Sequence, residues 1–240
     1  GHCSQKVIRS AKSLKWYCCC WAGVDHFCDE SLYQNPDCRL TNSSGAYGTT
    51  ISEHLIMVCL MLLRRQMEYT EIIRAGGWET LPGGIRSLHG ARITVLGTGD
   101  IGTEFARRAQ AFHPACITGV RRTVRSSDPA FTSIHAIAEL DSVLPETDIL
   151  VMALPSTAET VGILSRERIA LLPDSAFVVN VGRGTAIDQE ALCDALNAGR
   201  LAGAALDVVV PEPLPADHPL RRAKNLLLTP HVAGNMTLGY

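Results

Sequence analysis

The chain has 240 residues, 46% of them hydrophobic and 19% charged, and its formal net charge is −2. The length suits one large or two modest domains, and this composition excludes a disordered or fibrous protein. The small net charge provides no broad attraction to nucleic acid or to an anionic membrane, so we expect neither as a partner.

The first 47 residues contain short strand-like runs, Pro36 and the turn-forming sequence 42–45. The apolar run 16–22 includes Cys18, Cys19 and Cys20. Neighbouring side chains of a strand point to opposite faces, and no pair among the nine cysteines has the CxxC spacing of a zinc site. We therefore predict no bound metal, and interpret these thiols as small buried hydrophobic groups in a reducing, cytoplasmic compartment.

A helix is predicted from Ile51 to about Arg74, with Thr49 or Thr50 as its N-cap and Gly76-Gly77 at its end. Its richness in Leu, Met and Ile makes it too apolar for a surface that faces water. Its longest apolar stretch, 55–63, is far too short to span a bilayer, and the opening residues lack the basic-then-apolar order of a signal peptide.

From Ile93 onward, short apolar runs alternate with helical patterns such as 102–111 and 188–198. Runs without polar alternation are typical of strands buried on both faces, as in a parallel sheet covered by helices. The repeated strand–helix order predicts an α/β domain with a doubly wound parallel sheet. The predicted strands are 93–96, 116–120, 149–153, 177–181, 203–207 and 225–228.

Residues 97–102 read GTGDIG, a GxGxxG sequence that directly follows a predicted strand and precedes a predicted helix. In such a turn Gly97 permits the tight bend, Gly99 lets the backbone approach a pyrophosphate, and Gly102 allows close packing of helix and strand. The helix N-terminus offers free N–H groups to the phosphates. A dinucleotide site is therefore predicted here, with a glycine-rich turn that binds no ligand as the alternative.

An NAD-specific domain usually carries an acidic residue about 20 residues after this turn, where it holds the ribose 2′-hydroxyl. This chain has Arg121, Arg122 and Arg125 instead. Guanidinium groups suit a 2′-phosphate, so the sequence favours NADP(H), with NAD(H) as the alternative. Arginines that simply face water on a loop are the other interpretation.

Three later segments bring chemically useful residues to the ends of predicted strands. Arg183 lies between two glycines in 179–184, Glu212 lies between two prolines in 207–214, and His231 follows Pro230 in 228–234. Loops at the carboxyl ends of parallel strands line one crevice, so we expect these three side chains to converge.

These residues and motifs resemble the D-isomer-specific 2-hydroxyacid dehydrogenase family, which includes glyoxylate/hydroxypyruvate reductases and phosphoglycerate dehydrogenases. The resemblance runs from about Leu14 to the last residue. It rests on the glycine turn, the three segments above, and the motifs 21–25, 40–42, 52–54 and 153–155 with Thr160.

The resemblance implies a hydride transfer between NAD(P)H and a small 2-oxo acid. Arg183 would hold the substrate carboxylate and the 2-oxo oxygen, and His231 would donate or remove the proton. Glu212 would orient His231 and stabilise its protonated form, while backbone amides of Gly23 and Val24 would assist at the carboxylate. Asp207 would contact the nicotinamide amide of the cofactor. The full set of expected cofactor contacts is Gly97, Gly99, Asp100, Ile101, Gly102, Arg121, Arg122, Leu154, Pro155, Val181, Gly182, Asp207, His231 and Gly234.

The resemblance also implies a domain plan. Residues 1–47 would be part of a second, smaller and incomplete flavodoxin-like substrate domain, 48–234 the Rossmann-type dinucleotide-binding domain, and 235–240 the return to the substrate domain. Compared with the family pattern, the opening strand–helix region and a final helix are not in this sequence, so two alternatives stay open: a fragment, or only an ordered part, of a longer protein. The apolar helix 51–74 would take part in a homodimer.

Two other functions remain open at this point. A nucleotide-sensing corepressor or scaffold would share this fold and these residues but would lack physiological turnover. A related enzyme acting on formate or phosphite is the third hypothesis; Glu212 argues against formate, since formate dehydrogenases usually pair the histidine with glutamine.

Overall fold

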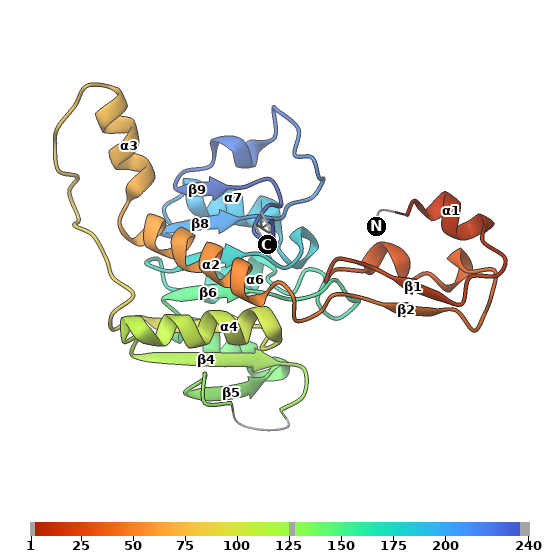
Figure 1. Cartoon of the computed structure of the whole chain (residues 1–240). Helices are drawn as coiled ribbons and strands as arrows, with labels where there is room; N and C mark the ends of the chain where they lie inside the picture. The colour runs from red at the N-terminus through yellow and green to blue at the C-terminus, as the bar shows by residue number, and fades with distance from the viewer. Residues whose placement is uncertain (1–2, 125–127, 236–240) are drawn as a thin grey trace. The chain divides into compact units, whose positions relative to one another are not determined.

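The structure is a computed structural model that describes residues 3–124 and 128–235 (Figure 1). Internal contacts divide the chain after Tyr47 into a small and a large unit. The small unit contains α1 (Gln5–Ser10) and two parallel strands, β1 (Trp16–Cys18) and β2 (Arg39–Thr41), joined through the 3-10 turns η1 (Asp25–Phe27) and η2 (Glu30–Leu32). Its core consists of Ile8, Tyr17, Cys19, Phe27 and Leu32.

The interpretation of all three neighbouring cysteines as buried groups was wrong for two of them. Cys19 is buried, whereas Cys18 and Cys20 are exposed, because the alternation of β1 continues past its last residue. No group of three metal-binding side chains lies together in the residues that the structure describes.

The large unit contains a sheet of seven parallel strands in the order β5-β4-β3-β6-β7-β8-β9. This confirms the predicted doubly wound α/β fold. The central strands are buried on both faces, as expected from runs without polar alternation. The strands are β3 (Arg92–Leu96), β4 (Cys116–Arg121), β5 (Ser133–Ala136), β6 (Ile149–Met152), β7 (Phe177–Asn180), β8 (Gly203–Leu206) and β9 (Leu226–Leu228).

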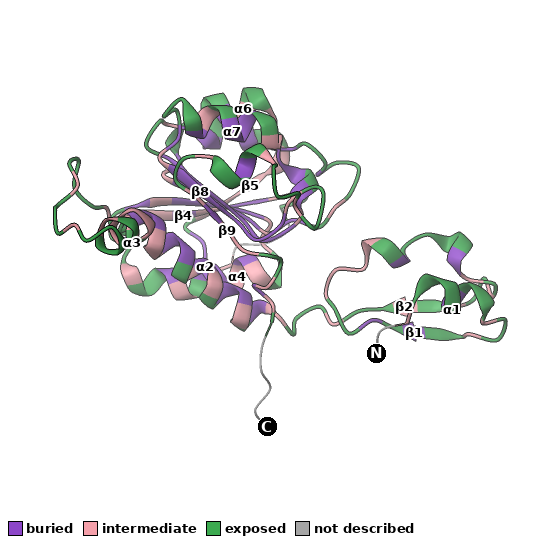
Figure 2. Ribbon diagram, turned by 90° about the horizontal axis from the view of Figure 1, so that it is seen from above, coloured by how far each residue is buried: buried purple, intermediate pink, exposed green. Residues whose placement is uncertain are grey.

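Helices cover both faces of this sheet and make a three-layer unit. Figure 2 shows α6 (Arg166–Leu171) and α7 (Gln189–Asn197) on one face, and α2 (Gly48–Leu63) and α4 (Asp100–Ala109) on the other. The short helix α5 (Leu140–Val143) precedes β6. A single hydrophobic cluster, which includes Leu150, Val178 and Leu192, fills the space between the sheet and α6 and α7. No described helix has the length and apolar character needed to cross a membrane.

The helix predicted from 51 to 74 is two helices. α2 ends at Leu63, and α3 (Gln66–Arg74) begins after Arg65, which has a left-handed φ of 55°. The Arg65 guanidinium donates to the Glu68 carboxylate and to the Pro82 carbonyl, and these bonds hold the break. The N-cap prediction was also wrong, because α2 begins at Gly48 and includes both threonines in its first turn.

The apolar residues of α2 have a partner inside the large unit. They include Leu55, Val58 and Leu62, which are at most 5% exposed, and the helix packs on α4, β7 and β8. By contrast α3 has no buried residue, and Trp78 after it is 92% exposed. Burial within the unit therefore accounts for the apolar character of α2, but not for that of the segment after it.

Candidate active site

The order of the strands reverses beside β3, in the middle of the sheet. The chain runs outward from β3 to β4 and β5, then returns to place β6 on the other side of β3. Helices after β3 and β6 therefore leave in opposite directions, and ligands of such sheets bind outside the carboxyl ends at this point. The hydrogen-bond ladder continues one residue into the loops, since Ala153 N donates to Leu96 O (2.9 Å) and Asp207 N to Asn180 O (3.0 Å).

The glycine turn lies at this point, between β3 and α4. Gly97 has φ 104°, and a Cβ added to it would lie 2.7 Å from the Ala153 carbonyl oxygen of the β6 loop. A Cβ at Gly102 would lie 2.0 Å from the Gly97 carbonyl oxygen. Both positions therefore require glycine for packing. Gly99 differs, because nothing lies within 4 Å of the Cβ position there.

The turn fits a dinucleotide pyrophosphate. The open side at Gly99 leaves room against the backbone, and α4 begins directly after it with unpaired N–H groups. Thr98 Oγ1 is buried and has no hydrogen-bond partner in the described part of the chain, so a phosphate oxygen would satisfy it. Asp100 and Ile101 form the first turn of α4, and the Asp100 carboxylate lies against Gly48 at the start of α2.

The predicted arginines follow the neighbouring strand. Arg121 is the last residue of β4 and is half-buried, Arg122 is exposed, and Arg125 lies outside the described residues. Gly97 N donates to Val120 O (2.9 Å), which places the glycine turn beside the end of β4. The pKa of the Glu159 carboxyl is lowered, mainly by its hydrogen bond with Thr157 and in smaller part by the positive charge of Arg122.

The loop after β6 supplies Leu154 and Pro155. Leu154 is buried, and a Cβ at Gly182 would lie 2.5 Å from its carbonyl oxygen, so the loops after β6 and β7 touch through this glycine. Thr160 holds the β6 loop, because its Oγ1 donates to Pro155 O (2.6 Å) and accepts from Thr157 N (2.8 Å).

Arg183 lies on a tight turn after β7, and sequence reasoning missed the residue that holds this turn. Asn180, only 1% exposed, donates from Nδ2 to Arg183 O (2.9 Å) and accepts at Oδ1 from Gly182 N (3.0 Å). A polar residue at the end of a buried apolar run, two residues before a glycine, was the available clue. Val181 and Gly182 are buried beside it, and a Cβ at Gly184 would lie 2.3 Å from the carbonyl carbon of Val209.

Asp207 lies at the end of β8 and fixes the backbone on both sides of His231. Its buried carboxylate accepts from Thr229 Oγ1 (2.6 Å), Val232 N (2.9 Å) and Ala233 N (3.0 Å). His231 N also donates to the Asp207 carbonyl oxygen (2.8 Å). This carboxylate therefore organises the loop that ends at Gly234.

The carboxylate of Asp207 also acts on a histidine of α2. Burial lowers the pKa of His54, and the negative charge of Asp207 opposes that effect.

Glu212 and His231 are brought together from two different loops. Glu212 Oε2 lies 2.8 Å from His231 Nδ1, and Glu212 Oε1 accepts from Val209 N (3.0 Å). Their side chains are 37% and 50% exposed. With Nδ1 held by the carboxylate, Nε2 is the ring nitrogen left to exchange a proton with a ligand.

The predicted site residues of the large unit thus occupy successive loops at one edge of the sheet. Gly23 and Val24 belong to the small unit, where Val24 precedes η1 and its carbonyl oxygen accepts from Phe27 N (2.8 Å). The structure does not place them relative to Arg183.

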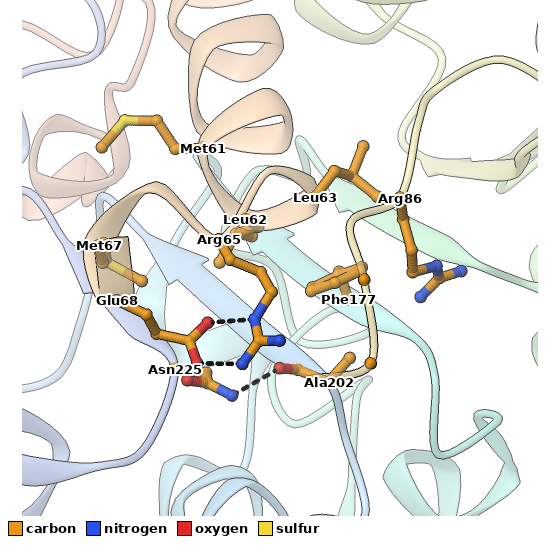
Figure 3. Close-up of a pocket in the computed structure, with 12 residues that line it drawn as sticks. Met61, Leu62, Leu63, Arg65, Met67, Glu68, Arg86, Phe177, Ala202 and Asn225 are labelled. Atoms are coloured by element: carbon orange, nitrogen blue, oxygen red, sulfur yellow. Dashed lines mark hydrogen bonds and ion pairs between the residues drawn. The ribbon is translucent and has the colours of Figure 1, made fainter. Parts of the chain in front are cut away.

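A separate cavity of about 230 Å³ lies at the opposite edge of the sheet (Figure 3). Phe177 begins β7, and Ala202 and Asn225 directly precede β8 and β9, so the cavity is at the amino ends of these strands. Its polar groups are paired within the chain, Arg65 with Glu68 (2.6 Å) and Asn225 Nδ2 with Ala202 O (3.1 Å). None of the predicted site residues lines it.

Comparison with known families decides the identity of this fold. The family model for the NAD-binding domain of D-isomer-specific 2-hydroxyacid dehydrogenases matches residues 56–233. The chain belongs to the D-isomer-specific 2-hydroxyacid dehydrogenase family. The match includes the glycine turn, Arg183, Glu212 and His231, so the family resemblance predicted from the motifs is confirmed.

Other members of the D-isomer-specific 2-hydroxyacid dehydrogenase family agree with this result. Glyoxylate/hydroxypyruvate reductase B of Pectobacterium carotovorum is 36% identical over 190 residues, which cover 76% of this chain and 58% of that protein. A family protein from Aeromonas salmonicida superposes with a TM-score of 0.86 at 34% identity, covering 96% of this chain and 72% of that one. The NADPH-dependent glyoxylate/hydroxypyruvate reductase of Sinorhizobium meliloti, solved with NADP and sulfate, gives 0.86 at 29%, covering 97% and 73%.

Proposed function

We propose that this chain supplies the dinucleotide-binding domain and the reacting side chains of an enzyme that interconverts a small 2-oxo acid and a D-2-hydroxy acid. The observation that carries the proposal is the contact of 2.8 Å between Glu212 and His231, in which the loop that carries Glu212 packs against the Arg183 turn. The relatives named above include reductases of glyoxylate and hydroxypyruvate, which favours 2-oxo acids of that size.

Each side chain has a defined role in this reaction. Arg183 binds the substrate carboxylate and polarises the 2-oxo oxygen through its planar set of donors. His231 donates the Nε2 proton to that oxygen during reduction and removes it in the reverse direction. Glu212 holds Nδ1 and stabilises the charged ring, and a bound NAD(P)H supplies the hydride.

We also propose a preference for NADP(H) over NAD(H). Arg121 ends β4 and Arg122 follows it, where an NAD-specific domain carries an acidic residue, and a 2′-phosphate there would pair with guanidinium groups. Replacing both arginines with serine should weaken NADPH binding by more than about tenfold while NADH binding changes little. Equal losses for the two cofactors would contradict this assignment.

A homodimer is proposed for the large unit. α3 buries none of its residues, and Ile73 and Trp78 are 53% and 92% exposed, so this segment has apolar surface to cover. Analytical ultracentrifugation at micromolar concentration should show a dimer; a monomer at every concentration would contradict it.

The activity is tested by measuring oxidation of NADPH and NADH with glyoxylate, hydroxypyruvate and pyruvate. His231→Ala should lower kcat by about 10²–10⁴-fold, because the proton donor is lost. His218→Ala is the matched control, since this histidine caps η7 (Pro219–Arg222) and its Nδ1 accepts from Leu220 N. Dinucleotide binding without turnover of any 2-oxo acid would reject the enzyme and favour a nucleotide-sensing scaffold. Oxidation of phosphite alone would favour the third hypothesis.

A further inference from the structure

Gln189 is half-buried and lies outside the set of reacting side chains, yet it binds a loop of the site. It is the first residue of α7, whose N-cap Asp188 accepts a hydrogen bond from Ala191 N (2.9 Å). Its Nε2 donates to Val210 O (2.5 Å), and its Oε1 accepts from Val210 N (2.9 Å). One primary amide therefore satisfies both polar backbone groups of a single residue, as a neighbouring strand would.

Val210 belongs to the segment that carries Glu212. This segment follows β8 and contains neither helix nor strand before η7, so no regular ladder holds it. Pro211 and Pro213 lack backbone N–H groups, which leaves few donors with which the segment can bind its surroundings. The Val210 side chain is 44% exposed, so burial contributes little to fixing it.

A continuous set of contacts joins Gln189 to His231. Gln189 holds Val210, the preceding Val209 N donates to Glu212 Oε1 (3.0 Å), and Glu212 Oε2 contacts His231 Nδ1 (2.8 Å). On the other side, the Val209 backbone packs against Gly184. Arg221 holds the far end of the segment by donating to Leu214 O (2.6 Å) and Pro215 O (2.7 Å). Before Glu212 the segment is thus held at Val209 and Val210, and the Gln189 amide is the hold nearer to the proline-flanked glutamate.

We propose that Gln189 is a positioning residue that sets where the Glu212 carboxylate meets the His231 ring. Without its amide, Val210 is free to move, and the Glu212 carboxylate no longer has one fixed place. The ring of His231 then samples orientations in which Nε2 does not face the substrate. The effect on turnover rests on the proposed function, whereas the effect on the His231 ring does not.

The kinetic test compares Gln189→Leu with Gln66→Leu. Leucine keeps similar bulk but makes no hydrogen bond. Gln66 is the matched control, because it is the first residue of α3 and its amide makes only a long contact, 3.4 Å from Nε2 to Thr70 Oγ1. Gln189→Leu should lower kcat on the order of tenfold while the Kd for NADPH stays unchanged, because only the acid–base pair is misplaced. Gln66→Leu should leave both constants unchanged. A kcat equal to that of the unmodified chain would overturn the proposal.

A double-mutant cycle separates positioning from general loss of structure. If Gln189 acts through Glu212, Gln189→Leu should cause little further loss of kcat in a Glu212→Gln background. The same fold loss in both backgrounds would show that Gln189 acts independently of Glu212, and the proposal would be wrong.

The imidazole spectrum provides a readout that needs no turnover. In chain labelled with ¹⁵N-histidine, the signal of His231 is assigned by its absence in His231→Asn. The His231 signals in Gln189→Leu should shift toward their positions in Glu212→Gln, whereas in Gln66→Leu they should not move. Unchanged His231 signals in Gln189→Leu would overturn the proposal even in an active enzyme. An inactive chain with shifted signals would instead reject only the proposed function.

Discussion

Replacing Asn180 with alanine removes both hydrogen bonds that hold the Arg183 turn, and the size of the effect follows from the groups left behind. The Gly182 N–H is buried and would lose its partner, which costs about 1–3 kcal/mol. The Arg183 carbonyl belongs to a half-buried residue that water can reach, so its loss costs less, about 1 kcal/mol. The free energy of unfolding should therefore fall by about 2–4 kcal/mol.

Urea unfolding followed by circular dichroism measures this loss, and steady-state kinetics measure its consequence for the site. Because the turn carries Arg183, KM for the 2-oxo acid should rise on the order of tenfold. Thr147→Val is the matched control, since this buried hydroxyl pairs with Thr94 Oγ1 (2.7 Å) before β6 and lies outside the site loops. It should lower stability but leave KM unchanged.

Two results would refute this reasoning about Asn180. If the alanine variant unfolds at the same urea concentration as the unmodified chain, the hydrogen bonds do not contribute as argued. If stability falls but KM and kcat remain as before, the Arg183 turn keeps its shape without Asn180.

Three further predictions concern the glycine turn, a carboxylate and a thiol. Gly102→Ala should unfold at lower urea concentration because its Cβ meets a carbonyl oxygen at 2.0 Å, whereas Gly99→Ala should fold normally but lose NADPH binding, measured by fluorescence. Burial raises the pKa of Asp148, but its hydrogen bonds with Arg92 outweigh that effect and lower it overall. A carboxyl group with a lowered pKa stabilises the folded state above about pH 4, and this stabilisation is lost as the pH falls through the folded-state pKa. Asp148→Asn should therefore make the free energy of unfolding depend less on pH in the acid range. An unchanged slope of unfolding free energy against pH would contradict this. Burial raises the pKa of Cys59 to about 12, so the thiol should resist alkylation at pH 8 until the chain unfolds, and rapid labelling of native protein would show otherwise.

The sequence was sufficient to predict the central strands and the edge at which the site lies. A run such as 177–180 is buried on both faces, and burial of that kind leaves a continuous apolar pattern in the sequence. Because all strands of this sheet are parallel, residues that follow the strands must lie at the same edge of the sheet. On this basis the sequence predicted that Glu212 and His231 lie close together, and the structure has them 2.8 Å apart.

Other elements left no such pattern. The apolar spacing of α2 continues past Arg65 with neither Gly nor Pro to indicate the break, which depends on bonds to Glu68 and Pro82. β5 was missed because its residues, Ser133–Ala136, are all half-buried and its hydrogen bonds come from β4 alone. The bonds of Asn180 and Asp207 to the site loops depend on tertiary placement that sequence spacing does not contain.

Three glycines hold neighbouring loops together at the carboxyl ends of the strands, and this affects how these loops can unfold locally. Gly97 touches the loop after β6, Gly182 touches the same loop from the other side, and Gly184 touches the loop after β8. Loops packed backbone to backbone cannot separate one at a time, and their first amides also donate to the adjoining strands. Amide hydrogens such as those of Val181 and Asp207 should therefore exchange with deuterium slowly and at a shared rate, as one cooperative unit with the sheet.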